Sequence, residues 1–138
     1  PVYIESESRK VGNLAVPEAL IFAMRASPCF KLELSDDERV KLLLEDYDFF
    51  VKNPNFFSQR LDALVAIRGK QVVEEWQRLI MTGDIEKVVR DLLLTHYDPT
   101  YFASMQRNFV LIDQAKVITA QDRSQKSMTL VAQSLAQV

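Results

Sequence analysis

The stretch Cys29-Phe30-Lys31-Leu32-Glu33-Leu34-Ser35-Asp36-Asp37-Glu38 marks the point at which the chain changes from strand to helix. Residues 29–34 are β-prone and partly alternate apolar with polar side chains, which predicts a strand. Ser35 and Glu38 have the spacing of an N-terminal capping box, and the two aspartates between them suit the positive end of a helix. We therefore expect a strand to end near residue 34 and a helix to begin directly after it.

Upstream, Val2-Tyr3-Ile4 is short, apolar and β-prone, and the polar run Glu5 to Lys10 follows it at once. Pro17 suits the first turn of a helix, and the apolar side chains that follow have helical spacing. The order strand, helix, strand over residues 1–34 predicts a β-α-β unit with parallel strands.

Downstream, apolar residues recur at helical spacing through residues 35–96, and Gly69 and Gly83 fall where two of these helices should end. We expect residues 97–138 to hold a Tyr-Asp-Pro turn, a strand within the β-prone stretches 109–112 and 116–118, and a final helix. The fold class predicted is α/β: one partial domain with a small parallel sheet of about three strands and a large helical insertion. Such a sheet has exposed edges through which copies of the chain could associate.

Composition excludes several classes of function. The 138 residues include one Cys and one His, so an intrachain disulfide, a Cys-rich zinc site and a multi-His metal site are impossible. Three glycines and the absence of GxxxxGK[ST] leave no phosphate-binding P-loop. The formal net charge of -2 gives no bulk sign of nucleic-acid binding. No apolar run is long enough for a membrane span, so we expect a cytoplasmic protein. From the residue counts above we also expect no metal site and no cofactor in this chain.

Two short segments could carry chemistry. The run Glu5-Ser6-Glu7-Ser8-Arg9 follows a predicted strand, and its carboxylates, hydroxyls and guanidinium could bind a phosphate group or orient a sugar hydroxyl. The alternative is a solvated loop with a local ion pair. The second segment, His96-Tyr97-Asp98-Pro99-Thr100-Tyr101, with Arg107 beyond it, could stack on bases and contact phosphate. The alternative is a turn that ends a helix, because Asp98 precedes a proline.

Other residues that could draw attention have simpler interpretations. Cys29 opens a predicted buried strand, so we expect a small core residue rather than a nucleophile. Trp76 has helical spacing and is expected in the core. Arg68 and Lys70 flank Gly69 and are expected to be charges at helix ends.

Several segments together resemble the C-terminal part of the tRNA 2-selenouridine synthases. The resemblance rests on residues 1–12, on Val16-Pro17-Glu18-Ala19-Leu20 with Met24, on the Gly69 and Thr82-Gly83-Asp84 links, and on Leu94 to Tyr101. It covers roughly residues 1–107. It implies a transferase that replaces the sulfur of wobble 2-thiouridine in tRNA with selenium from selenophosphate, through a geranylated intermediate. Selenophosphate and geranyl diphosphate are then substrates of the full-length enzyme, and tRNA is its partner.

The resemblance also implies what is missing. Family members carry an N-terminal rhodanese-like domain with a reactive cysteine and then a P-loop, and this sequence has neither. The expected fold is then the second half of a P-loop nucleotide kinase-like domain, inactive alone, and Cys29 does not match the reactive cysteine. No catalytic residue is assigned, and the set expected to face the substrate is Glu5, Glu7, Ser8, Arg9, His96, Tyr97, Asp98, Tyr101 and Arg107. The alternatives are a stand-alone helical interaction module and, against the missing Walker A sequence, a nucleotide kinase-like enzyme.

Overall fold

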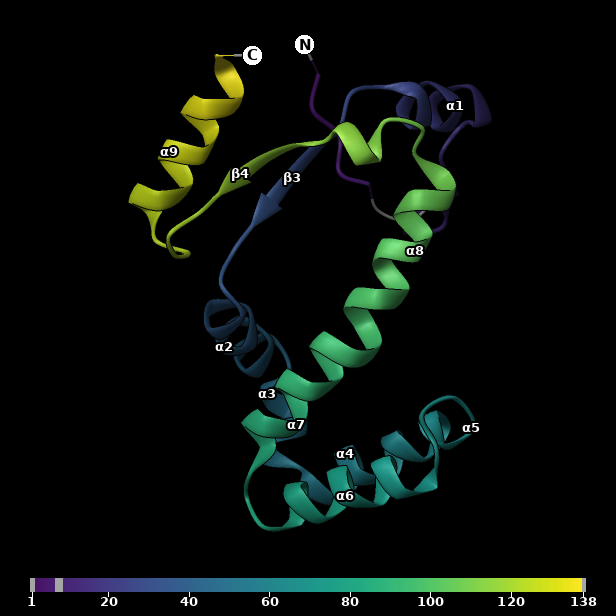
Figure 1. The fold of residues 1–138 in the computed structure, drawn as a ribbon, viewed down its shortest axis with the longest axis vertical. Helices are drawn as coiled ribbons and strands as arrows, with labels where there is room; N and C mark the ends of the chain where they lie inside the picture. Colours follow the sequence, from purple (N-terminus) through teal and green to yellow (C-terminus); the bar gives the residue numbers. More distant parts are fainter. Residues whose placement is uncertain (1, 7–8, 138) are drawn as a thin grey trace.

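The computed structural model describes residues 2–6 and 9–137 (Figure 1). Short strands lie at one end of the molecule with helices α1 (Glu18–Ala26) and α9 (Gln125–Ala136). The other end is helical and contains α4 (Pro54–Leu61), α5 (Val65–Arg68) and α6 (Lys70–Met81). The molecule is thus α/β but mostly helical.

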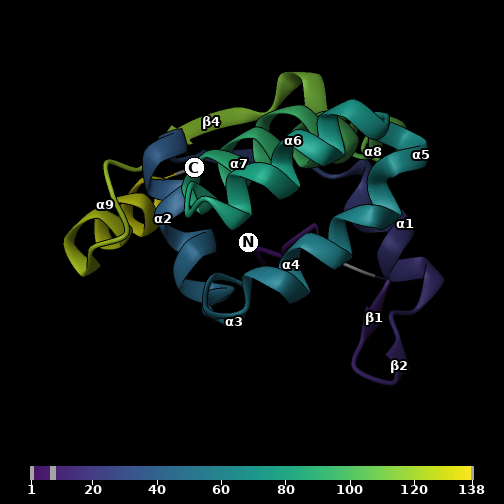
Figure 2. The ribbon, with the colours of Figure 1, turned by 90° about the horizontal axis from the view of Figure 1, so that it is seen from below.

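The sheet is smaller than expected. Strand β3 (Phe30–Glu33) pairs in parallel with β4 (Lys116–Thr119), in the register Phe30↔Lys116 to Glu33↔Thr119. These two strands confirm the predictions for residues 29–34 and 116–118. Within the described residues the parallel sheet has two strands and not three. A separate antiparallel hairpin, β1 (Lys10–Val11) with β2 (Leu14–Ala15), projects from the body of the molecule (Figure 2).

The strand predicted at Val2-Tyr3-Ile4 is wrong. This segment lies in no ladder and is held by side-chain contacts instead. The Tyr3 hydroxyl donates a hydrogen bond to the Leu135 carbonyl, and the Tyr3 ring meets the Phe30 ring edge to face at 5.9 Å. The expected β-α-β unit over residues 1–34 therefore does not form, and the partner of β3 comes from the far end of the chain.

The β-prone stretch 109–112 forms no strand. The amide of Val110 donates to the Arg25 carbonyl at 3.0 Å, and the chain then turns into the short 3-10 helix η3 (Ile112–Gln114). Because these backbone groups are used in a tertiary contact and a tight turn, β-propensity does not decide the local structure.

The helix N-termini predicted from the capping residue Ser35 and from Pro54 are confirmed. Helix α2 (Asp36–Asp46) begins where predicted, and the Ser35 side chain accepts a hydrogen bond from the Glu38 amide at 3.3 Å. Pro54 occupies the first turn of α4. The apolar stripe through residues 40–51 is split between α2 and α3 (Asp48–Lys52) by a change of backbone angles at Tyr47.

The break predicted at residues 96–101 is wrong. Helix α7 (Ile85–Leu92) continues through η2 (Leu93–Tyr97), one turn of π-helix, into α8 (Asp98–Asn108). Pro99 lacks the N–H that would reach back to the Thr95 carbonyl. That carbonyl accepts a hydrogen bond from the Arg68 guanidinium at 2.9 Å instead. A wide turn and an outside donor together let a proline lie inside a long helical segment.

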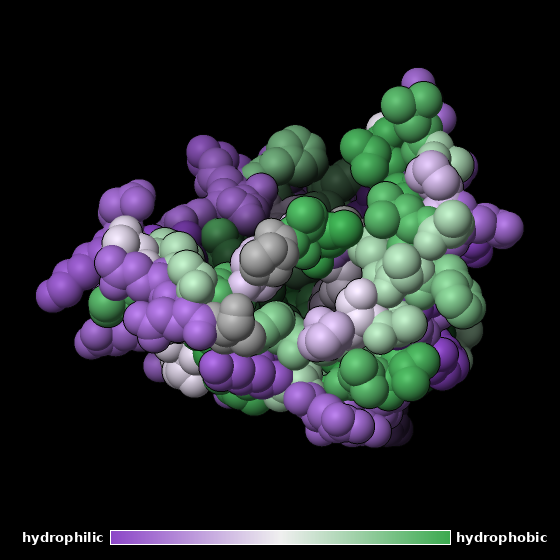
Figure 3. Space-filling view, turned by 90° about the horizontal axis from the view of Figure 1, so that it is seen from above, coloured by the Kyte–Doolittle hydropathy of each residue, from purple (hydrophilic) through white to green (hydrophobic). Residues whose placement is uncertain are grey.

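The hydrophobic core lies at the helical end, between α4, α6 and α7. Trp76 is 2% exposed, as predicted for a core residue, and the buried cluster comprises Leu61, Val73, Trp76, Leu79, Ile80, Ile85, Val88 and Leu92. The sheet end is different. Val2, Leu32, Val117 and Leu130 are each at least half exposed, and hydrophobic side chains gather on this face of the molecule (Figure 3).

Candidate functional site

The two segments singled out from the sequence meet in space. The Ser6 side chain, in the N-terminal acidic run, and the Tyr101 hydroxyl, in the first turns of α8, lie 3.1 Å apart in a hydrogen bond. The two residues are 95 positions apart in the chain. The long helical segment that runs through Pro99 carries Tyr101 to this place, so the continuity of the helix is what brings the segments together.

A pocket of about 260 Å³ lies beside this contact, between Ser6, Arg9, α1 and the second half of α8, and none of the residues 96–101 lines it. Its wall has contributions from the N-terminal run, from α1 and from the second half of α8. Ile21 and Met105 are both 8% exposed and form part of its apolar lining. The residues that line the pocket are Ser6, Arg9, Ile21, Met24, Arg25, Ser104, Met105, Asn108 and Phe109.

The polar side of the pocket holds two cations. Arg9 forms an ion pair with Glu18 at 3.6 Å, but the two side chains are 61% and 93% exposed, so this pair is weak. The half-buried Arg25 has no ion-pair partner within residues 2–6 and 9–137. The Asn108 amide donates to the Ser104 carbonyl at 2.8 Å, which fixes the face of α8 that borders the pocket. The pocket therefore offers positive charge and hydroxyl groups beside an apolar surface.

Asp98 has a structural partner. Its carboxylate accepts two hydrogen bonds from the Arg39 guanidinium, at 2.9 and 2.5 Å, and joins the start of α8 to α2. The hydrogen bonds that Arg39 donates to Asp98 raise the pKa of the Arg39 guanidinium above its ordinary value. This contact holds α8 in place, and a substrate would have to displace Arg39 to reach the carboxylate.

The aromatic residues of the second segment lie along the π turn and α8. The His96 and Tyr97 rings meet edge to face at 5.2 Å, and Tyr97 is 59% exposed. Tyr101 meets Phe102 in the same way at 6.1 Å, and the Lys31 ammonium lies 4.8 Å from the centre of the Phe102 ring. This exposed row of rings is suited to stacking on flat groups such as bases.

The remaining predicted site residues are placed less favourably. Glu5 is exposed, and Arg107 is exposed in the last turn of α8 and does not line the pocket. Glu7 and Ser8 lie outside the described residues. The sequence reasoning missed Arg25, Ser104 and Asn108. Ser104 and Asn108 are four residues apart, which is the signal that would have placed them on one helix face had α8 been predicted.

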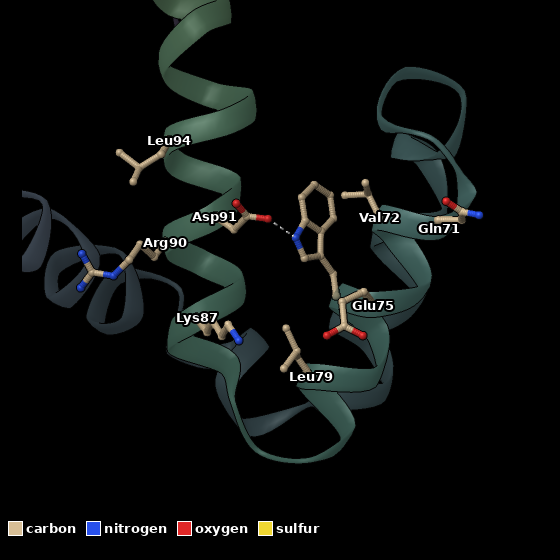
Figure 4. Close-up of a pocket in the computed structure, with 9 residues that line it drawn as sticks. Gln71, Val72, Glu75, Leu79, Lys87, Arg90, Asp91 and Leu94 are labelled. Atoms are coloured by element: carbon tan, nitrogen blue, oxygen red, sulfur yellow. Dashed lines mark hydrogen bonds between the residues drawn. The ribbon is translucent and has the colours of Figure 1, made fainter.

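A larger open groove of about 590 Å³ lies between α6 and α7 (Figure 4). The Trp76 indole donates a hydrogen bond to the Asp91 carboxylate at 2.6 Å across it. Apolar side chains such as Val72 and Leu94 border it alongside the charged Glu75, Lys87 and Arg90. None of the residues predicted to face a substrate lines this groove, so its size does not make it the candidate site.

Cys29 is half-buried, and its thiol donates a weak hydrogen bond to the Ser27 carbonyl. Burial raises the pKa of this thiol, which is opposite to what a nucleophilic cysteine needs. No group of three or more His, Cys, Asp or Glu side chains within the described part of the chain could hold a metal ion. No helix in that part combines the length and the apolar character of a membrane span.

Comparison with known proteins gives a consistent result. The family profile described as tRNA 2-selenouridine synthase AAA domain matches residues 1–63. A tRNA 2-selenouridine synthase of Marinobacter nauticus is 28% identical over 92% of this chain and 42% of its own length. One of Cupriavidus necator is 48% identical over 32% of this chain and 12% of its own length. No solved structure matches.

This chain thus spans less than half the length of the curated relatives that it matches. The profile and both relatives carry the same family description, and the profile match includes Ser6 and Arg9, which line the pocket. The resemblance noted from the sequence is therefore confirmed, and the chain is related, over part of their length, to the tRNA 2-selenouridine synthases.

Proposed function

We propose that this chain works as the C-terminal part of a tRNA 2-selenouridine synthase. The full enzyme would be a cytoplasmic transferase that replaces the sulfur of wobble 2-thiouridine with selenium from selenophosphate, through a geranylated intermediate. Selenophosphate, geranyl diphosphate and tRNA would be its substrates. The observation that carries the proposal is the contact between Ser6 and Tyr101, because it joins the two segments on which the family resemblance rests.

In this proposal the chain supplies substrate contacts. Tyr97 and Tyr101, which are 59% and 51% exposed, would place a base or a prenyl group, with His96 behind them. Arg9 at the pocket and Arg107 on the surface of α8 would neutralise phosphate charge. Asp98 would act through Arg39 by keeping α8 in register with α2.

The sheet end supports the view that the rest of the enzyme is needed. A two-stranded parallel sheet is marginal in water without further strands or covering helices. Leu32 in β3 and Val117 in β4 are 57% and 50% exposed. We infer that further segments of a longer enzyme, among them the P-loop that the family resemblance implies, extend or cover this sheet, and that the 138-residue chain has no activity alone.

A chimera tests the proposal. The corresponding region of the Marinobacter nauticus synthase is replaced with this chain, and 2-selenouridine in tRNA is measured by mass spectrometry. We expect selenium transfer by the chimera and none by the 138-residue chain. Arg9→Ala and Tyr97→Ala should each lower the rate of the chimera about tenfold or more.

Matched controls keep this test specific. Arg78→Ala removes an exposed arginine of α6, and Tyr47→Ala removes a tyrosine that is 56% exposed, close to the 59% of Tyr97. Both should leave the rate unchanged. Unchanged rates in the Arg9 and Tyr97 variants would remove both residues from the site. Selenium transfer by the 138-residue chain would show that it is complete.

The α6–α7 groove favours a second function, a stand-alone helical interaction module. Val72 and Leu94 line the groove and are 37% and 40% exposed. A folded chimera that binds tRNA but transfers no selenium, whatever the state of Arg9, would favour this alternative over the synthase.

A further inference from the structure

We propose that the pocket between the N-terminal run, α1 and α8 binds a small phosphate compound through a doubly charged phosphate or diphosphate group, with Arg25 as its main ligand. The proposal rests on the pocket itself and does not require the proposed function. It assigns a role to Arg25 and Ser104, which neither the sequence motifs nor the comparisons single out.

The state of Arg25 is the first argument. Four arginines of this chain have a carboxylate oxygen between 2.5 and 2.8 Å away: Arg39, Arg78, Arg90 and Arg123. Arg25 is half-buried, yet no carboxylate in the described part of the chain pairs with it. A partly desolvated guanidinium without a counter-charge favours the binding of an anion, and its planar fork suits phosphate oxygens.

The position of Arg25 is the second argument. It lies in the last turn of α1, and its carbonyl accepts the Val110 amide just after the end of α8. The carbonyl ends of two helices therefore meet beside the pocket, and their partial negative charge stabilises an arginine there in the absence of ligand. The same partial charge opposes the binding of any anion, so the pocket needs both of its guanidinium groups, Arg25 and Arg9, to hold one, and a group with two negative charges can neutralise both.

The other lining groups complete a phosphate site. Arg9 adds a second guanidinium, which pairs weakly with Glu18 at 3.6 Å, and the Glu18 side chain is 93% exposed. The Ser104 side-chain oxygen lies 3.4 Å from the Asn108 amide, which donates to it and leaves the hydroxyl proton free for a ligand. The apolar side of the pocket, which includes Ile21 and Met105, lowers the local dielectric and strengthens these charged hydrogen bonds. A volume of about 260 Å³ has room for a diphosphate group.

The test uses the purified 138-residue chain and three probes: inorganic pyrophosphate, inorganic phosphate and a short single-stranded RNA. Binding is measured by isothermal titration calorimetry and by phosphorus NMR, at fixed ionic strength. We expect pyrophosphate to bind with a Kd below about 1 mM. Arg25→Met should weaken this binding about tenfold or more, and Ser104→Ala should weaken it by a smaller factor.

Arg60→Met is the matched control, because it removes an exposed arginine from the last turn of α4 outside the pocket. It should bind pyrophosphate as the unsubstituted chain does. Circular dichroism and a urea titration show whether each variant is folded, and Arg25 forms no ion pair with another described residue whose loss would unfold the chain. Arg25→Lys, which keeps the charge but not the fork, should recover part of the affinity.

Three results would overturn the proposal. The first is the absence of pyrophosphate binding at millimolar concentration. The second is equal binding by the Arg25→Met and Arg60→Met variants. The third is Arg25-dependent binding of RNA without binding of pyrophosphate, which would assign the pocket to a phosphodiester backbone. The chimera described above can remain active in all three cases, so a failure here is distinct from a failure of the proposed function.

Discussion

The ion pair between Arg39 and Asp98 should be a measurable source of stability, because it joins two helices that are far apart in the sequence. The carboxylate accepts hydrogen bonds of 2.9 and 2.5 Å, and the Arg39 and Asp98 side chains are 31% and 21% exposed. Exposed pairs contribute about 0.2–1 kcal/mol, and hydrogen bonds to charged groups contribute about 1.5–3 kcal/mol. With both side chains mostly shielded from solvent, we expect a coupling energy of about 2 kcal/mol.

A double-mutant cycle with Arg39→Met and Asp98→Ala, followed by urea denaturation, measures this energy. The single variant Asp98→Ala should lower Tm by roughly 7 °C for a chain of this length. Asp36 provides the matched control because it also pairs with Arg39, at 3.3 Å and 48% exposed. The cycle with Asp36→Ala should give a coupling below about 0.5 kcal/mol. A coupling for Asp98 no larger than that for Asp36 would refute the reasoning.

Four further predictions concern single sites. Two hydrogen bonds from Arg123 lower the pKa of Glu45 below its ordinary 4.5. The stability that this ion pair contributes is therefore present above pH 4.5 and is lost as the pH falls. The urea midpoint of Glu45→Gln should change less than that of the unsubstituted chain between about pH 5 and pH 3. Burial raises the pKa of the Cys29 thiol, so a thiol reagent at pH 8 should react with the folded chain more slowly than with the chain in urea. Gly69 has φ +86° and ψ 151° with no atom near its missing Cβ, so Gly69→Ala should cost about 1–3 kcal/mol of unfolding free energy through backbone strain alone. Arg68→Met leaves the Thr95 carbonyl without its donor and should cost about 1–2 kcal/mol, and an unchanged urea midpoint would show that water replaces the guanidinium.

Local signals predicted the parts of the fold that depend on local physics. The Ser35 cap and the proline at the start of α4 determine where helices begin, because each satisfies or removes an orphan backbone donor within a few residues. The β-prone stretches Val2–Ile4 and 109–112 form no strand for the opposite reason. Their backbone or side-chain groups are used by partners more than eighty residues away, namely Leu135 and Arg25, and no pattern within the segments reports that.

Some residues of the candidate site could also be identified from the sequence, whereas others depend on the fold. The residues of the two motifs could be identified from their composition, and the contact of Ser6 with Tyr101 supports grouping them. The pocket beside them could not be predicted, because it depends on where α1 and α8 end relative to one another. Arg25 is unremarkable in the sequence, since an arginine in the last turn of a helix is ordinary. It is set apart by being half-buried with neither a carboxylate nor a side-chain hydrogen-bond partner among the described residues.

At Asp98-Pro99 a local sequence signal is overruled by distant contacts, and the same contacts position the candidate site. Taken alone, a residue before proline is biased away from helix, and that bias predicted a turn. In the folded chain the Asp98 carboxylate is bound by Arg39 from α2, and the Thr95 carbonyl that Pro99 cannot use is bound by Arg68 from the end of α5. Two arginines from separate helices thus satisfy the groups on either side of the proline and keep α7, the π turn and α8 in one line. Without that line Tyr101 would not reach Ser6, so the helical block between residues 35 and 96 has a direct role in assembling the pocket at the other end of the molecule.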